Sequence, residues 1–185
     1  MMPELSLHVL DIVQNSISAH ATDIAVNIEV NPKSDILLIE IVDNGQGMTE
    51  TQKIHSVDPF FTTRTTRTIG LGIPFLKQAT AMANGTFSIH STPSQGTTIQ
   101  ATFQLSHIDR MPLGNISDTI YLLIVCNPNI HFSYRYTYDN RHFRLDTNEI
   151  LDIIGDISLL TPEVKTFIKE YLIENIFEVD KGLIE

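Results

Sequence analysis

The sequence contains no tryptophan, has a single cysteine, and carries far fewer basic than acidic residues. Among 185 residues there are 12 Lys or Arg against 22 Asp or Glu, which gives a formal net charge of −10. An average field of this sign repels nucleic acid, and the sequence shows no local basic patch that would overcome it. The charge balance therefore argues against nucleic-acid binding as the function.

Long hydrophobic runs and disulfide partners are also missing. No segment approaches the roughly 18 consecutive apolar residues of a membrane span. The polar, acidic N-terminus lacks the basic and apolar regions of a signal peptide. Cys126 has no second cysteine to pair with, and its apolar surroundings, TIYLLIVC, predict a buried thiol in a reducing compartment. We expect a cytoplasmic protein without a membrane partner.

Hydrophobic residues make up 42% of the chain and charged residues 18%, as in ordinary globular proteins. The length suits one main domain with room for a small appended unit. The character of the sequence changes at His107, so we place a boundary within 107–117 and expect domains at residues 1–106 and 107–185. The second part either extends the sheet of the first or forms its own α+β unit that binds a partner.

The first hundred residues alternate between helical and strand-like patterns. Apolar residues recur at helical spacing near the N-terminus, and two β-like runs then flank the turn-forming segment NPKSD. Thr49 can cap a short helix, and Asn84-Gly85 is a good helix stop. The resulting prediction is helices over 4–20, 49–55 and 71–83, with strands over 25–30, 36–43, 86–92 and 97–105.

The remaining residues read as a second α+β pattern. We predict a strand over 119–126, a hairpin over 131–147 with a turn at Asp139-Asn140, and helices starting near Thr147 and Thr161. Aromatic side chains alternate along the hairpin, which fits either core packing or a surface for a protein partner. These aromatic residues are Phe132, Tyr134, Tyr136, Tyr138 and Phe143.

A polar stripe marks the N-terminal helix. On a helical wheel, Glu4, His8, Asp11, Asn15 and Ser18 fall in one narrow sector, opposite an apolar face. One explanation is a solvated helix face. The other is that Asp11 and Asn15, one turn apart in the segment DIVQN, point together into a cavity that holds a metal ion and phosphates.

The segment DNGQGM suggests a base-binding site. Asp43 ends a predicted strand, and Gly45 and Gly47 follow, which lets the backbone approach a ligand closely. A carboxylate at this place can accept a hydrogen bond from an exocyclic amine and so distinguish adenine from guanine. A plain Asp-Asn-Gly turn after a strand would give the same residues.

Two further segments, DPFFTTR at 58–64 and GLGIP at 70–74, suggest a phosphate site. Gly70 and Gly72 open a helix whose N-terminal amides can bind phosphate, with added charge from Arg64, Arg67 or Lys77. A glycine turn is also a common way for any helix to begin. The hydroxyl of Thr97, between two strands, could reach a base, although a hairpin turn explains that residue equally well.

Together, the four segments resemble the N, G1, F and G2 boxes of the GHKL superfamily, which includes gyrases, 90-kDa heat-shock chaperones, histidine kinases and MutL-type repair ATPases. DIVQNSISAHATDI is similar to an N box, VDNGQGM to a G1 box, DPFFTTR to an F box and IGLGIPFLK to a G2 box. The resemblance covers about residues 4–105. It implies an α+β Bergerat fold: a two-layer sandwich of a mixed, mostly antiparallel sheet with helices on one face, here with a small C-terminal α+β extension.

The same resemblance implies roles for individual residues, with ATP and Mg²⁺ as cofactors. Asn15 would hold Mg²⁺, Asp43 would bind the adenine amine, and Thr97 would touch the base side. Asp11 occupies the place where MutL-like members and anti-sigma-factor kinases have a glutamate that activates the nucleophile, and Asp is one methylene shorter. The implied site is Asp11 as the catalytic residue and, for ATP binding, Asn15, Asp43, Gly45, Gly47, Met48, Arg64, Gly70, Leu71, Gly72 and Thr97.

Three functions fit this resemblance. The first is a stand-alone histidine-kinase-like ATPase or kinase subunit in signal transduction; because no phospho-acceptor helix precedes the N box, the accepting histidine or serine would belong to another chain. The second is a MutL- or gyrase-like switch in which ATP controls homodimerisation or a partner. The third is a nucleotide-sensing adaptor that does not hydrolyse ATP, which is compatible with Thr68 where the G2 box usually has glycine.

Overall fold

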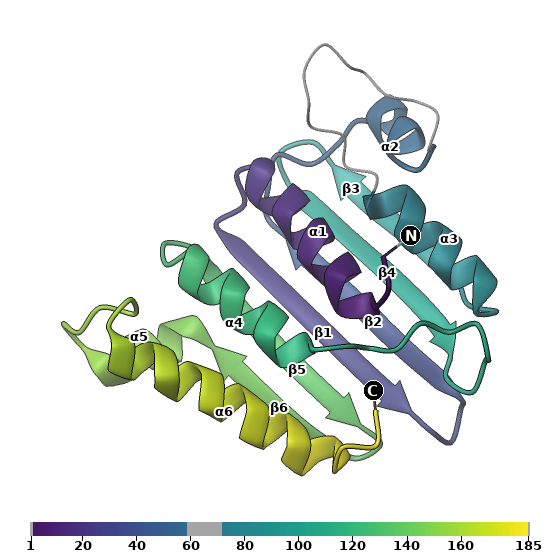
Figure 1. Ribbon diagram of the computed structural model, residues 1–185. Helices are drawn as coiled ribbons and strands as arrows, with labels where there is room; N and C mark the ends of the chain where they lie inside the picture. Colours follow the sequence, from purple (N-terminus) through teal and green to yellow (C-terminus); the bar gives the residue numbers. More distant parts are fainter. Residues whose placement is uncertain (1, 59–71, 185) are drawn as a thin grey trace.

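The computed structural model describes residues 2–58 and 72–184, and its centre is one six-stranded mixed sheet (Figure 1). The strand order is β3-β4-β2-β1-β5-β6, and every neighbouring pair is antiparallel except β1 and β5, which run parallel. The strands are β1 (Asp23–Asn31), β2 (Ile36–Asp43), β3 (Phe87–Thr92), β4 (Gly96–Gln104), β5 (His131–Tyr138) and β6 (Arg141–Asp146).

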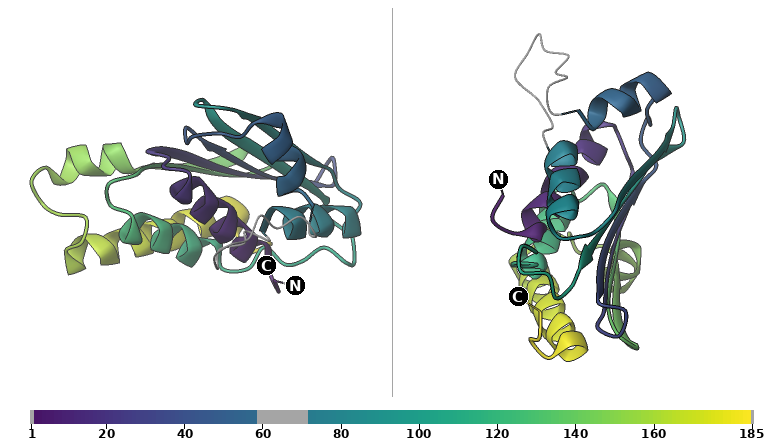
Figure 2. Two further views of the ribbon diagram at one scale, coloured as in Figure 1. Left: turned by 90° about the horizontal axis from the view of Figure 1, so that it is seen from above. Right: turned by 90° about the vertical axis from the view of Figure 1, so that its right-hand side faces the viewer.

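Helices form the second layer. In both views of Figure 2, α1, α3, α4 and α6 lie on the same side of the sheet, so the molecule is a two-layer sandwich of the predicted α+β class. The shorter helix α2 precedes the undescribed segment, and α5 follows β6 and packs on β5 and β6. The bounds are α1 (Leu5–Ser18), α2 (Glu50–Ser56), α3 (Gly72–Met82), α4 (Ile116–Cys126), α5 (Thr147–Ile154) and α6 (Pro162–Asp180).

The two faces of the sheet differ in chemistry. Alternate residues of β1, including Val26 and Ile28, are buried beneath the helices, as period-two alternation requires. On the opposite face the strands carry polar side chains. There, Asn27 Nδ2 donates to Glu40 Oε2 at 2.8 Å and Gln100 Nε2 donates to Glu40 Oε1 at 2.7 Å. Helices α1, α3, α4 and α6 therefore cover the apolar face.

Most of the predicted elements of the first hundred residues are confirmed. The N-terminal helix, the β1–β2 hairpin and the β3–β4 hairpin lie within a few residues of their expected positions. Thr49 caps α2, where its side chain accepts from Gln52 N and the Gln52 side chain accepts from the Thr49 amide. Asn84, just beyond α3, has the left-handed backbone expected at a helix stop, with φ of 51°.

The predicted strand over 119–126 is wrong, because this segment belongs to helix α4. Asn115 caps the helix by accepting from Asp118 N at 3.0 Å. Ile116, Ile120 and Leu123 are buried at helical spacing, but a short run rich in Ile, Leu and Val does not separate a strand from a buried helix by composition. Cys126, predicted to be buried, is exposed at the end of α4.

Residues beyond 107 continue the sheet of the first part. β5 pairs along the length of β1, from Asp23 with His131 to Val30 with Tyr138, and β6 then forms the outer strand. Phe132, Tyr134 and Tyr136 are almost completely buried, which makes most of the aromatic hairpin part of the core. The position of a domain boundary at 106/107 stays a prediction.

We predict that a fragment comprising residues 1–106 will aggregate or unfold at a lower temperature than the full chain. Removing β5 would turn β1 into an unprotected edge strand, and α1 would lose its contact with α4. Size-exclusion chromatography and thermal unfolding of both proteins will measure the difference. A monomeric fragment that unfolds cooperatively at the full-length temperature would instead establish residues 1–106 as an independent domain.

Candidate functional site

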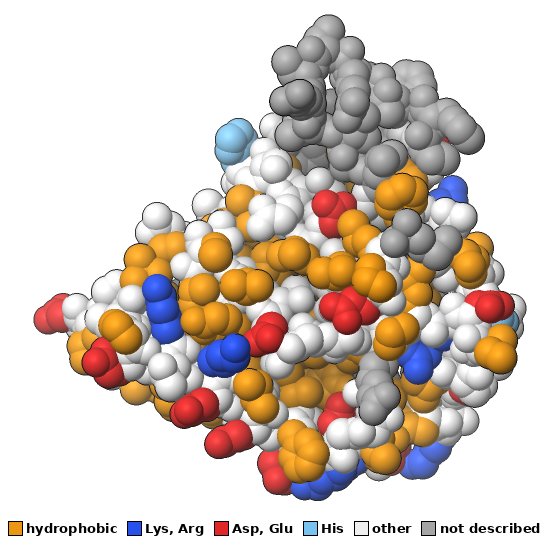
Figure 3. Space-filling model, in the orientation of Figure 1, with side chains coloured by type: hydrophobic (Ala, Val, Ile, Leu, Met, Phe, Trp, Pro, Cys, Tyr) orange, Lys and Arg blue, Asp and Glu red, His pale blue; other side chains and the backbone are white. Residues whose placement is uncertain are grey.

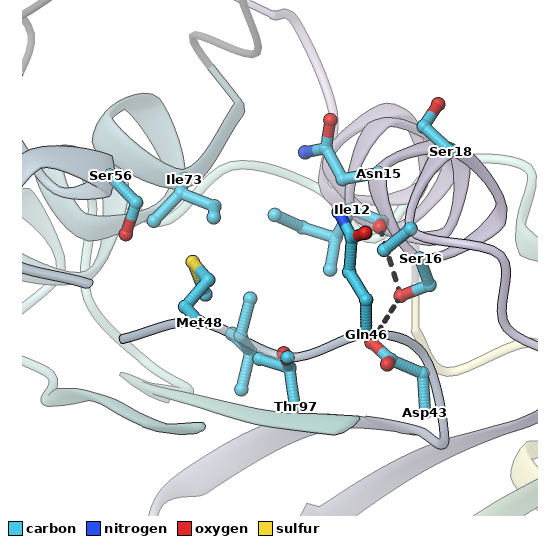
Figure 4. A pocket seen from close by; sticks show the side chains of 13 residues that line it. Ile12, Asn15, Ser16, Ser18, Asp43, Gln46, Met48, Ser56, Ile73 and Thr97 are labelled. Carbon is cyan, nitrogen blue, oxygen red and sulfur yellow. Dashed lines mark hydrogen bonds between the residues drawn. The ribbon is translucent and has the colours of Figure 1, made fainter. Parts of the chain in front are cut away.

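A cavity of about 290 Å³ lies between α1, the segment after β2, the start of α3 and strand β4. Figure 4 shows Asn15 and Ser18 on the α1 side, with Asp43 and Thr97 on the side of the sheet. Met48 and Ile73 supply apolar surface at the other end. A pocket with apolar walls and a few convergent polar groups is the usual form of a small-molecule site.

Asp43 is a firmly held polar group of the cavity. It ends β2, and only 9% of its surface is exposed. Ser16 Oγ donates to Asp43 Oδ2 at 2.6 Å, and the amide of Gly45 donates to Asp43 Oδ1 at 2.8 Å. These two bonds fix the plane of the carboxylate, and each carboxylate oxygen keeps further lone-pair capacity for a ligand donor.

The segment after Asp43 is shaped by glycine. Gly47 has φ of 63°, and a Cβ at this position would overlap the carbonyl of Thr92. The turn is held by Gln46, whose amide donates to Ala19 O at 2.9 Å, and by Met48, whose amide donates to Ser91 Oγ at 2.8 Å. The loop therefore joins the end of α1 to the β3–β4 hairpin.

Thr97 lies directly across the β2–β4 ladder from Asp43. Its Oγ1 is 2.9 Å from Ser91 Oγ, and either hydroxyl can be the donor. Because Ser91 Oγ also accepts a hydrogen bond from the Met48 amide, the hydroxyls of Ser91 and Thr97 connect β4 with the segment that follows Asp43. Asp43, Met48 and Thr97, three of the residues predicted to bind ATP, thus lie close together, and their role in binding stays a prediction.

The predicted site residues of α1 lie in two places, one in the cavity lining and one at its edge. Asn15 lines the cavity, whereas Asp11, one turn earlier, is half-buried against the start of α3, where a Cβ at Gly72 would overlap its carboxylate. Burial raises the pKa of Asp11. The solvated-stripe explanation fails for His8, which is fully buried, and neither of its ring nitrogens has a hydrogen-bond partner among the described residues.

Three predicted residues, Arg64, Gly70 and Leu71, lie outside the described residues, as does most of the segment DPFFTTR. Among the described residues there is no cluster of three or more His, Cys, Asp or Glu side chains that could hold a metal ion. The metal-binding prediction therefore depends on Asn15 together with ligand oxygens. Nor does any described helix have both the length and the apolar character needed to cross a bilayer.

Ser16, which holds Asp43, is not among the residues predicted from the sequence. A signal was present, because Ser16 falls on the apolar face of α1 next to Ile12 and is 4% exposed. A small hydroxyl residue on the buried face of an amphipathic helix needs a hydrogen-bond partner. The apolar residues Ile73 and Ile99 also line the cavity without having been predicted, because their approach to it depends on tertiary packing.

Comparison with known protein families identifies the class to which this fold and cavity belong. Residues 3–107 match the family described as "Histidine kinase-, DNA gyrase B-, and HSP90-like ATPase". The chain belongs to this family and carries its ATP-binding domain. The superfamily resemblance seen in the four sequence segments is thereby confirmed.

Curated relatives include two kinases. The chain is 34% identical over 110 residues to "Sensor protein kinase FleS" of Pseudomonas aeruginosa, covering 60% of this chain and 27% of that protein. It is 29% identical over 99 residues to "Probable C4-dicarboxylate sensor kinase" of Bacillus subtilis, covering 51% of this chain and 18% of that protein. A "Non-motile and phage-resistance protein" of Caulobacter vibrioides is 29% identical over 110 residues, or 55% of this chain and 13% of the relative. The chain thus spans about a quarter or less of these relatives.

Solved structures support the fold. The N-terminal domain of a DNA repair protein superimposes with a TM-score of 0.53 at 14% identity, covering 95% of this chain and 57% of that one. The Aquifex aeolicus MutL ATPase domain complexed with ADP gives a TM-score of 0.50 at 14% identity, covering 83% of this chain and 70% of that one. At this identity the likeness shows the fold alone.

We predict that Gly47→Ala will weaken ligand binding and lower stability by roughly 1–3 kcal/mol, because it combines a left-handed backbone with a clash against Thr92. Gly155→Ala is the matched control, since Gly155 also has a positive φ but no described atom within 4 Å of the place that a Cβ would take. Chemical denaturation and nucleotide titration of both variants measure the two effects. Equal losses of stability and unchanged binding in both variants would contradict a steric role for Gly47.

Proposed function

We propose that the protein binds Mg-ATP in this cavity, with the adenine against Asp43. The observation that carries the proposal is the Asp43 carboxylate, held by Ser16 and Gly45 at the base of a pocket with apolar walls. Such a carboxylate accepts a hydrogen bond from the exocyclic amine of adenine, and guanine offers an oxygen at that place. Thr97 supports the base side, and Met48 provides apolar contact.

The phosphates would extend from the base toward Asn15 and the start of α3. Mg²⁺ commonly takes one or two protein oxygens and completes its octahedron with phosphates and water, so a single side-chain amide oxygen from Asn15 fits it. When bound, Mg²⁺ neutralises charge on the phosphates. The N-terminal end of α3 supplies a favourable dipole for the remaining negative charge.

The reaction we propose is transfer of the γ-phosphoryl group to a histidine or serine of a partner protein. The bond between the γ-phosphorus and the β,γ-bridging oxygen breaks, a bond to the acceptor nitrogen or oxygen forms, and ADP leaves. Asp11 takes the proton of a serine acceptor, or of water in a hydrolytic turnover. Its raised pKa makes it a better base than an exposed carboxylate. The similarity to two kinases supports this assignment.

A second candidate function is an ATP-gated switch that controls homodimerisation or a partner. The observation that favours it is the coverage of the structural likeness, because the DNA repair protein domain superimposes on 95% of this chain and therefore includes the region after residue 107. In this case Asp11 would activate water and the switch would reset by slow hydrolysis. A nucleotide-sensing adaptor without turnover is the third outcome of the tests below.

Asp43→Asn should reduce Mg-ATP affinity by about tenfold or more. The variant places an amide where the ligand amine needs an acceptor, and a misplaced hydrogen bond to a charged group costs about 1.5–3 kcal/mol. Isothermal titration calorimetry with ATP and GTP measures the loss. Asp139→Asn, an exposed change in the β5–β6 turn, is the control. If the unaltered protein binds no adenine nucleotide, the proposed function is wrong.

Asp11→Asn should retain Mg-ATP binding and lose turnover, because Asp11 lies beside the cavity rather than in it and contributes a proton acceptor. In the unaltered protein, turnover should fall on acidification as Asp11 becomes protonated. Because the pKa of Asp11 is raised, this loss of turnover should occur at a higher pH than for an ordinary aspartate. ADP release at several pH values, together with nucleotide titration, separates the two effects. Turnover that survives in Asp11→Asn would exclude Asp11 as the base.

The kinase and switch hypotheses differ in where the γ-phosphate goes. Incubation with γ-labelled ATP and the native partner should label the partner if the protein is a kinase. ATP-dependent dimerisation on size-exclusion chromatography, with release of inorganic phosphate and no labelled protein, would instead support the switch. Binding without either product would leave the nucleotide-sensing adaptor.

A further inference from the structure

His131 lies between two carboxylates that belong to different parts of the fold. It is the first residue of β5, and 27% of its side chain is exposed. Its Nδ1 is 3.0 Å from Asp23 Oδ1 on β1, and its Nε2 is 2.8 Å from Asp146 Oδ1 at the end of β6. The imidazole therefore bridges the ATP-binding domain, residues 3–107, and the region that follows it.

On the side of the ATP-binding domain, the bridge continues to Asn44, the residue after Asp43. Asn44 Nδ2 donates to Asp23 Oδ2 at 2.8 Å and to Thr22 Oγ1 at 2.9 Å. Asn44 Oδ1 accepts from the amides of Thr22 and Asp23 at 2.9 and 3.0 Å. With both ends of its amide in use, Asn44 fastens the segment that follows β2 to the start of β1.

On the other side, Asp146 joins the bridge to helix α5. Its Oδ1 also accepts from the amide of Asn148 at 3.0 Å, which caps α5, and its Oδ2 accepts from Arg144 at 2.8 Å. Asp146 is 9% exposed, so its charge needs these partners. A continuous polar chain thus runs from α5 through Asp146, His131 and Asp23 to Asn44.

We propose that His131 is a positioning residue for the nucleotide site, which holds Asp23 and Asn44 in place and so fixes residues 43–48, the segment that presents the base-binding carboxylate. The inference rests on the proposed nucleotide binding and assigns a role in it to the region after residue 107. His131 itself lies outside the cavity and touches no part of the expected ligand.

The bridge is complete only when both ring nitrogens carry a proton. Partial burial alone lowers the pKa of His131, but the hydrogen bonds and charges of Asp23 and Asp146 outweigh it and raise the pKa above 6.5. Arg144, in contact with Asp146 and Glu149, is the nearby positive charge. The stabilisation is therefore fully present below pH 6.5 and is lost as the pH rises through the raised pKa of His131.

The test compares the unaltered protein with His131→Gln and Asp146→Asn by Mg-ATP titration between pH 6 and 9. We expect His131→Gln to bind about threefold or more weakly at the acidic end, the scale of a partly exposed ion pair, and to lose the pH dependence that the unaltered protein shows. Asp146→Asn keeps the cap of α5 and should move the pH transition lower. His142→Gln, an exposed histidine on β6, is the matched control and should behave as the unaltered protein does.

Amide hydrogen exchange of residues 44–48 in the nucleotide-free protein provides a second readout. Exchange should be faster in His131→Gln than in the unaltered protein or His142→Gln. Unchanged affinity, pH profile and exchange in His131→Gln would overturn the inference while leaving nucleotide binding intact. If the unaltered protein binds no nucleotide, the proposed function fails, and exchange alone decides whether His131 positions this segment.

Discussion

The site depends on the burial of one carboxylate. Asp43 stands at the end of β2 under α1, with 9% of its surface exposed, and a buried charge is tolerated only when it is hydrogen-bonded. Ser16 and the Gly45 amide each donate a hydrogen bond to one oxygen of the Asp43 carboxylate. These bonds require α1 to cross the sheet beside the end of β2 and the chain to turn tightly after Asp43. The same two bonds leave lone pairs free for a ligand in the cavity. The hydrogen bonds that stabilise the buried Asp43 carboxylate therefore also orient it to accept a hydrogen bond from a ligand.

Strand β1 connects the strand that carries Asp43 with the region after residue 107. It pairs with β2 on one side and with β5 on the other, so the region after residue 107 is joined to the ATP-binding domain by a complete ladder of strand pairing. Figure 3 shows Lys and Arg side chains scattered among Asp and Glu on the helical face, with no continuous basic area among its described side chains. The described side chains of the helical face therefore form no surface suited to binding a polyanion. Strand pairing and the polar chain through His131 connect the ATP-binding domain with the region after residue 107.

Local signals in the sequence predicted the helices and hairpins of the first hundred residues, because caps, turn residues and periodicity act over a few positions. The Thr49 cap and the Asn84 stop are examples. For residues 119–126 the sequence wrongly predicts a strand, because an almost uniformly apolar run has no clear period and only Asn115 at its start indicates a helix. Asp43, Met48 and Thr97 could be placed at one site through family motifs. Ser16 and His131 could not, because their partners lie 27 residues away in the first case and 108 and 15 in the second.

The proton-acceptor role proposed for Asp11 requires its short side chain to reach the phosphate end of the cavity. Gly72 carries no Cβ, and the Asp11 carboxylate occupies the space that a side chain there would fill. This close approach brings the charge to the start of α3, the end of a helix where anionic phosphates are also favoured. Burial already raises the pKa of Asp11, and phosphates bound nearby would raise it further because like charges disfavour ionisation. A bound nucleotide would therefore strengthen Asp11 as a proton acceptor at the moment when one is needed, while the added repulsion would favour release of the charged product.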